Sequence, residues 1–129
     1  MRKATVVVST VLLTATACGS GTPDASSTVA ERFYQAIQAK DGGTACSLLA
    51  PKTAQEVEES GQASCDTAIL DEDIPDGGTV TDLHQYGGQA QVRLRGDTAF
   101  LAEFDDGWKI VAAACTPQGE QPYDCKLKG

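Results

Sequence analysis

Five cysteines are the residues of this 129-residue chain whose chemistry could go furthest beyond packing: Cys18, Cys46, Cys65, Cys115 and Cys125. None of them stands in a C-x-x-C pair, the spacing that zinc sites and thioredoxin-like redox motifs use. We therefore expect no metal site and no cysteine-based catalysis. In an exported chain such cysteines are typical of structural disulfides.

Cys18 ends a segment laid out like an export signal. Met1-Arg2-Lys3 is basic, residues 4–17 carry no charge, and the segment is shorter than the about 20 residues of a membrane-spanning helix. The run Ala15-Thr16-Ala17-Cys18-Gly19-Ser20 resembles the bacterial lipobox, with Ala15 where leucine is more usual. That resemblance implies a diacylglycerol on the Cys18 thiol. The alternative is an ordinary secretory signal cut near Ala17, but lipidation leaves an even set of four cysteines and is favoured.

The sequence thus divides into three parts. Residues 1–17 are a lipoprotein signal peptide, and residues 18–27 are the lipidated cysteine with a flexible, polar tether. Residues 28–129 form one domain, a length that suits a single core. We expect this domain at the outer face of the cell membrane, held by the lipid on Cys18.

The charge of the chain excludes one class of partner. It has 18 acidic and 10 basic side chains, a net charge of −8, and loss of Arg2 and Lys3 with the signal peptide makes this −10. Nucleic-acid phosphates and anionic lipid surfaces repel such a chain. We expect no nucleic-acid binding, and membrane attachment must come from acyl chains.

Four aspartates are spaced somewhat like the ligands of a calcium loop: Asp71, Asp73, Asp76 and Asp82. However, Gly77 is one position beyond the place where a calcium loop has its glycine, and Pro75 occupies a position that should supply a ligand. A solvated acidic loop is the better interpretation. His84 is the only histidine, so a catalytic triad or histidine metal site would depend on it alone. We assign no catalytic residue, no metal and no cofactor.

The first half of the domain has helical periodicity. Its clearest apolar stripe is Val29, Phe33 and Ile37. A capping-box pair, Thr28 and Glu31, precedes this stripe and Gly42-Gly43 follows it, which predicts a helix over 29–40. Shorter helices are predicted from Thr44 to Leu49, over 52–60 and near 64–71.

From Thr79 onward the periodicity becomes two. Ala90, Val92 and Leu94 alternate with polar residues, which predicts a half-buried strand. Further strands are predicted at 80–86, 100–104, 108–115 and 123–127. Helices followed by an antiparallel meander make an α+β domain, in which the N-terminal helices pack on a sheet of four to five strands.

The segment Asp105-Asp106-Gly107 predicts a three-residue hairpin loop with Gly107 in the left-handed conformation. This loop sets Glu103 opposite Lys109 on one face. On the other face it makes three pairs: Phe104 with Trp108, Ala102 with Ile110, and Phe100 with Ala112.

An apolar patch then lies on the face away from those aromatic residues. Its members are Leu101 and Val111, with Ala99 and Ala113 beside them. An apolar patch on a sheet needs a cover. It predicts a homodimer through the sheet unless the C-terminal segment of the same chain covers it, and the sequence leaves both alternatives open.

Two disulfides, Cys46–Cys65 and Cys115–Cys125, are predicted from topology. Four cysteines allow three pairings, and spacing alone does not choose among them. Cys46 and Cys65 lie on short helices joined by a polar segment that can double back. Cys115 ends one strand and Cys125 lies in the next, and antiparallel neighbours are within disulfide reach.

Several segments of the domain resemble small secreted actinobacterial lipoproteins of the nuclear-transport-factor-2-like (cystatin-like) superfamily. They are Glu31-Arg32-Phe33-Tyr34, Cys46-Ser47-Leu48-Leu49-Ala50-Pro51, Cys65 in its own short helix, Gly107-Trp108-Lys109-Ile110-Val111 and Pro122-Tyr123-Asp124-Cys125. The resemblance implies a strongly bent sheet wrapped around the first helix as a cone. It implies no single function, because that fold hosts enzymes and binding modules alike.

Members of that superfamily that are enzymes place a carboxylate or tyrosine in an apolar pocket for acid–base work. Here the corresponding pocket would be lined by Phe33, Tyr34, Ile37, Phe100, Phe104 and Trp108. We expect these residues to be core instead, and the domain to bind a protein or small apolar ligand without chemistry. An acid–base enzyme and a structural envelope component are the two alternatives.

Overall fold

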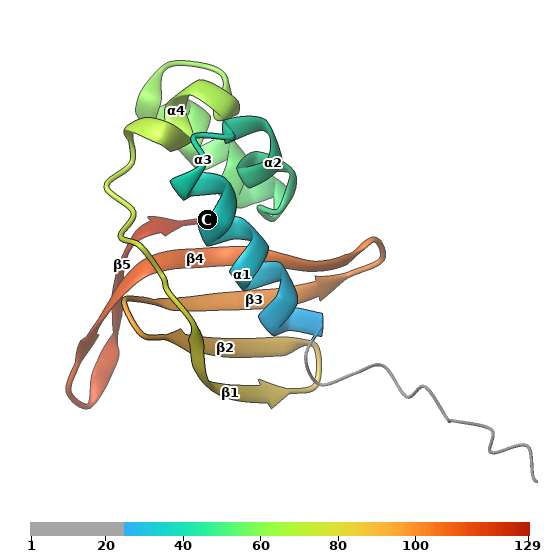
Figure 1. Ribbon diagram of the computed structural model, residues 1–129, viewed down its shortest axis with the longest axis vertical. Helices are drawn as coiled ribbons and strands as arrows, with labels where there is room; N and C mark the ends of the chain where they lie inside the picture. The colour runs from blue at the N-terminus through green and yellow to red at the C-terminus, as the bar shows by residue number, and fades with distance from the viewer. Residues whose placement is uncertain (1–24) are drawn as a thin grey trace, which may run out of the picture.

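The computed structural model describes residues 25–129 and shows an α+β domain (Figure 1). Its helices are α1 (Ala25–Gln38), α2 (Gly42–Ser47), α3 (Pro51–Gly61) and α4 (Cys65–Asp71). Its strands are β1 (Val80–Tyr86), β2 (Gln89–Leu94), β3 (Thr98–Phe104), β4 (Gly107–Gln118) and β5 (Gln121–Lys128). Each strand pairs antiparallel with the next, in the order β1-β2-β3-β4-β5. The predicted fold class is confirmed. The signal peptide and Cys18 lie outside the described residues.

Helix α1 lies across one face of the sheet, and α2, α3 and α4 gather beyond its β4 side (Figure 1). Phe33 and Ile37 of α1 belong to one buried cluster with Val92, Leu101 and Ile110 of the sheet. None of these five side chains is more than 6% exposed. The space between α1 and the sheet is therefore filled by apolar side chains.

The first helix begins earlier than predicted. Residues 25–27, which the sequence assigned to the tether, form the first turn of α1. Ser26 and Ala30, one turn apart, are both fully buried, so packing extends the helix beyond the local capping signal. Thr28 lies inside the helix and does not cap it, so the predicted start was wrong.

The glycines after α1 also have a different role from the predicted one. Lys40 takes the left-handed conformation (φ 57°) just after α1 ends, and Gly42 opens α2. The Asp41 carboxylate caps α2 by accepting the Thr44 N–H at 3.1 Å. A side chain at Gly42 would overlap the backbone of Asp66. Gly42 therefore permits the close approach of α2 and α4 rather than ending α1.

The β3–β4 hairpin differs from its predicted register. Its loop has two residues, Asp105-Asp106, so Phe104 pairs with Gly107 and Glu103 with Trp108. Farther along, Val111 is an extra residue in β4, because Leu101 pairs with Ile110 and Phe100 with Ala112. The loop is one residue shorter than predicted, and the bulge adds one residue to β4, so the two differences offset each other beyond the bulge. The predicted Phe100–Ala112 pair is therefore confirmed, while the predicted pairs nearer the loop are wrong.

The predicted cross-strand charge pair is also absent. Lys109 pairs with Ala102 in the ladder instead of with Glu103. Its Nζ atom donates to the Ser47 carbonyl oxygen at 2.8 Å and lies 3.4 Å from an Asp106 carboxylate oxygen.

The two faces of β3 are the reverse of the prediction. Ala99 and Leu101 are buried on the α1 side, as is Ala113 of β4, whereas Phe104 is 39% exposed. The bulky α1 residues Phe33 and Tyr34 need short side chains opposite them, which favours alanine over phenylalanine on this face. Ala99, Leu101 and Ala113 are therefore core, and the outer patch that suggested a homodimer does not exist in that form.

Of the remaining elements, α2 begins two residues earlier than predicted and β3, β4 and β5 are longer than predicted, with β4 continuing past Cys115 to Gln118. Helices α3 and α4 and strand β1 match their predicted ranges to within one residue, and Ala90, Val92 and Leu94 of β2 are all buried. Both disulfides, Cys46–Cys65 and Cys115–Cys125, are formed as predicted. The first ties α2 to α4, and the second ties β4 to β5.

Candidate functional site

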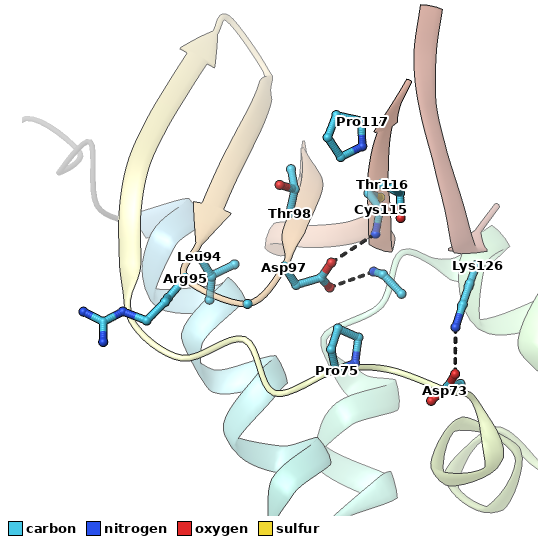
Figure 2. A pocket seen from close by; sticks show the side chains of 12 residues that line it. Asp73, Pro75, Leu94, Arg95, Asp97, Thr98, Cys115, Thr116, Pro117 and Lys126 are labelled. Carbon is cyan, nitrogen blue, oxygen red and sulfur yellow. Dashed lines mark hydrogen bonds and ion pairs between the residues drawn. The ribbon is translucent and has the colours of Figure 1, made fainter. Parts of the chain in front are cut away.

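An open cleft of about 400 Å³ lies between the β2–β3 loop and a bend in β4 (Figure 2). Asp97 projects from the loop toward the bend, and Pro75, from the segment between α4 and β1, borders the same space. The bend is at Ala114, a non-glycine residue with a left-handed φ of 52°. We call this space the Asp97 cleft.

The carboxylate of Asp97 accepts hydrogen bonds from three donors. One oxygen accepts the Ala114 N–H at 2.8 Å and the Tyr34 hydroxyl, and the other accepts the Cys115 N–H at 3.1 Å. The left-handed turn at Ala114 presents these two successive backbone N–H groups to one carboxylate. Asp97 thereby joins the sheet loop, the β4 bend and α1, three segments far apart in the sequence.

Tyr34 is the buried partner in this network. It is 2% exposed, and burial, followed by the hydrogen bond to Asp97 and its negative charge, raises the pKa of the phenol well above its ordinary value. A Cβ atom at Gly77 would lie 2.6 Å from Cγ of the Tyr34 ring. Glycine at position 77 thus lets the segment between α4 and β1 pass directly over the ring.

The cations of the Asp97 cleft lie at its border. Lys126 of β5 reaches across to Asp73, with 2.7 Å between Nζ and the carboxylate oxygen (Figure 2). Both groups are exposed, and each shifts the partner's pKa toward the charged form: the Asp73 pKa is lowered and the Lys126 pKa is raised. Arg95 points away from the cleft in the same view. Both oxygens of Asp97 already have protein donors, and the other carboxylate of the cleft, Asp73, is paired with Lys126.

The six residues predicted to line one pocket do not meet in a single cavity. The buried α1 residues Phe33, Tyr34 and Ile37 belong to the hydrophobic core, and Trp108 packs at the edge of this core. Phe100 and Phe104 are on the opposite side of β3 from the buried Leu101.

The outer face of the sheet carries a second open space, of about 490 Å³. We call it the outer hollow; it is lined by Tyr86, Gln89, Ala90, Gln91, Phe100, Leu101, Ala102 and Val111. All of these side chains are uncharged. Tyr86 is 77% exposed, which makes it the most exposed large apolar side chain of the described residues.

The predicted acidic loop and the histidine lie at the surface. Asp71, Asp73 and Asp76 are exposed, and His84 is exposed beside Asp82, with 2.9 Å between Nε2 and the carboxylate oxygen. Among residues 25–129 no group of three or more histidine, cysteine, aspartate or glutamate side chains is arranged to hold a metal ion.

Sequence reasoning missed Asp97. The residue follows Arg95-Gly96 between two strands, where glycine and aspartate are ordinary turn residues. Its partners are Tyr34, 63 positions earlier, and the two amides 17 and 18 positions later. No local pattern contains that information.

Comparisons with models of protein families, with curated proteins and with solved structures find no match for this chain. No helix within the described part of the chain is long and apolar enough to cross a membrane.

Proposed function

We propose that this protein is a lipid-anchored extracytoplasmic domain that binds a ligand or partner without catalysing a reaction. The observation that carries the binding role is the filled space between α1 and the sheet, where Phe33, Ile37 and Leu101 occupy the volume that an enzyme of this shape would keep open. Binding then falls to the surface, where the outer hollow is available. Membership in the nuclear-transport-factor-2-like superfamily is part of the same proposal and rests on the sequence segments that resemble that superfamily.

The anchor is supported by the basic start, the uncharged segment and the small residues before Cys18. With α1 beginning at Ala25, six residues separate Cys18 from the domain. A chain of that length reaches at most about 25 Å when fully extended. The domain would therefore stay close to the membrane surface, where its negative charge keeps it off anionic headgroups.

An acid–base enzyme is the second candidate, and the hydrogen-bonded Tyr34–Asp97 pair at the edge of an open cleft favours it. In that role Asp97 would exchange a proton with a substrate in the cleft. Against it, Tyr34 is buried and Asp97 already accepts three hydrogen bonds. The same network is what a structural crosslink between α1 and β4 requires.

The anchor is tested by intact mass and detergent partition of the protein from its native envelope. We expect the chain to begin at Cys18 with a diacylglycerol mass increment and to enter the detergent phase, and Cys18→Ala to block maturation. Native protein found unmodified in the medium would contradict the anchor.

The binding role is tested by crosslinking in intact cells, followed by mass spectrometry of the captured material. We compare the wild-type chain with Tyr86→Ala and with Asp97→Asn at equal protein levels. Capture that requires Tyr86 but not Asp97 supports surface binding. Capture that requires Asp97 alone supports the cleft, and retention on the cell wall regardless of both variants supports a structural envelope role.

A further inference from the structure

The outer hollow owes its shape to the order of large and small side chains on one sheet face. Tyr86 pairs with Gln89, and Gln89 pairs with Ala102. The next row pairs Gln91 with Phe100. Cross-strand partners project on the same face, so the short Ala102 leaves a depression with aromatic rings at its margins and amide groups along β2.

The aromatic side of the hollow is fixed by contacts within the sheet. Phe100 meets Tyr123 of β5 edge to face, with 5.2 Å between ring centroids. The Gln91 Nε2 atom donates to the Tyr123 hydroxyl at 3.1 Å. This bond orients the Gln91 amide and leaves its carbonyl oxygen and second N–H available for a ligand.

We propose that the outer hollow binds a neutral oligosaccharide of β-linked pyranose sugars; this identifies the ligand class of the binding role proposed above. The C–H faces of such sugars are weakly electropositive and pack on the electron-rich faces of aromatic rings. Neighbouring hydroxyls of one sugar match the donor and acceptor of a glutamine amide. The volume lies in the range of small-molecule sites, about 300–1,000 Å³.

Charge favours a neutral ligand over a charged one. None of the eight residues that line the hollow is charged, although 22% of the chain is charged. The net charge of −8 repels polyanions. A cationic ligand would find no carboxylate among the lining residues.

The apolar area favours a small polar ligand over a second copy of the chain. Tyr86 and Phe104 are the two large hydrophobic side chains that are exposed among the described residues. Two exposed rings are few for a homodimer, because stable homodimers bury a largely apolar surface of about 2,000 Å² or more. The amide groups of Gln89 and Gln91 would also need partners in such an interface.

The test is a titration of the ¹⁵N-labelled full chain, in a detergent without sugar headgroups, with cellohexaose and with N-acetylchitohexaose. We expect amide shifts in β1, β2 and β3 that include Tyr86, Gln91 and Phe100, at millimolar or lower ligand concentration. Oligogalacturonate of the same length carries a carboxylate on each sugar and should bind at least tenfold more weakly.

Three variants and one matched control make the assignment specific. Tyr86→Ala should lower the affinity about tenfold, Gln89→Ala should lower it as well, and Tyr86→Phe should retain it. Gln85→Ala, next to Tyr86 but in register with the buried Ala90, should bind like the wild type. Tyr86, Gln89 and Gln85 are exposed, so all four variants should keep the wild-type fold and spectrum.

The proposal is overturned if neither neutral oligosaccharide shifts these amides at 10 mM ligand (a concentration about tenfold above a millimolar Kd). Shifts confined to the Asp97 cleft, or an unchanged affinity of Tyr86→Ala, also overturn it. Concentration-dependent shifts of the same face without sugar would assign the hollow to self-association instead. A negative result here leaves the lipid anchor and the capture experiment unaffected, so the two proposals fail separately.

Discussion

Replacing Asp97 with alanine should destabilise the domain far more than is usual for a turn residue. The substitution removes the acceptor of three donors: the Tyr34 hydroxyl and the N–H groups of Ala114 and Cys115. These three residues are 2%, 7% and 6% exposed. A buried donor left without a partner costs about 1–3 kcal/mol.

The expected loss is about 3 kcal/mol, the low end for three donors, because water can enter the open cleft and satisfy part of the network. Such a loss is a large share of the about 5–15 kcal/mol that stabilises a domain of this size. It should lower Tm by more than about 10 °C. Tyr34→Phe removes one donor and leaves the other two bonds intact, so its loss should be smaller, about 1–2 kcal/mol.

The assay is urea unfolding followed by the fluorescence of Trp108, the single tryptophan, with the disulfides intact. The variants are Asp97→Ala, Tyr34→Phe and the double variant, whose combined loss should be less than additive because the residues share a bond. Asp73→Asn is the matched control, since Asp73 is an exposed carboxylate at the same cleft, and it should leave the midpoint unchanged. A loss below about 1 kcal/mol for Asp97→Ala, or strict additivity in the double variant, would refute this account of the network.

Three further outcomes are expected. The raised Tyr34 pKa in the folded state means that the contribution of Tyr34 to stability is complete below the ordinary phenol pKa of about 10 and is lost as the pH rises above it. Urea midpoints measured from pH 8 to 11 should therefore fall with pH for the wild type and fall less for Tyr34→Phe. An equal fall of the midpoint with pH in both proteins would contradict this. Replacing Cys46 with serine opens the 19-residue separation to Cys65 and should cost about 3 kcal/mol, with Cys65 detected as a free thiol by alkylation; a Cys65–Cys125 peptide in non-reducing maps would show that the pairing is different. Gly77→Ala should cost about 1–3 kcal/mol by overpacking the Tyr34 ring. Gly43→Ala within α2 should be neutral or stabilising, because its Cβ would make only an ordinary contact, 3.8 Å from an Asp41 carboxylate oxygen; thermal melts that rank the two variants in the reverse order would count against the close contact at Gly77.

The sequence alone determined those features whose cause is local. Alternation of Ala90, Val92 and Leu94 with polar residues defines a strand with one buried face, because a period of two leaves only one way to hide the apolar side chains. The disulfides were also predictable, since Cys46 and Cys65 belong to the helical half and Cys115 and Cys125 to adjacent strands.

Only the tertiary structure decided which way β3 and β4 face. Both strands are apolar on both sides near Leu101 and Ile110, so the alternation of side chains does not indicate which side of these strands is buried. The bulk of Phe33 and Tyr34 on α1 selects the small Ala99 and its neighbours, and the phenylalanines of β3 turn outward. The outer hollow is a consequence of that choice.

Asp97 is the clearest case of a residue whose role no local pattern reveals. Its neighbours along the chain indicate a turn and nothing more. Its three donors come from α1 and from the β4 bend at Ala114, and they converge only when the sheet has formed and α1 has packed across it. A hydrogen-bond network between distant segments is set by their relative placement in space, and it is therefore decided by the fold rather than by the local sequence.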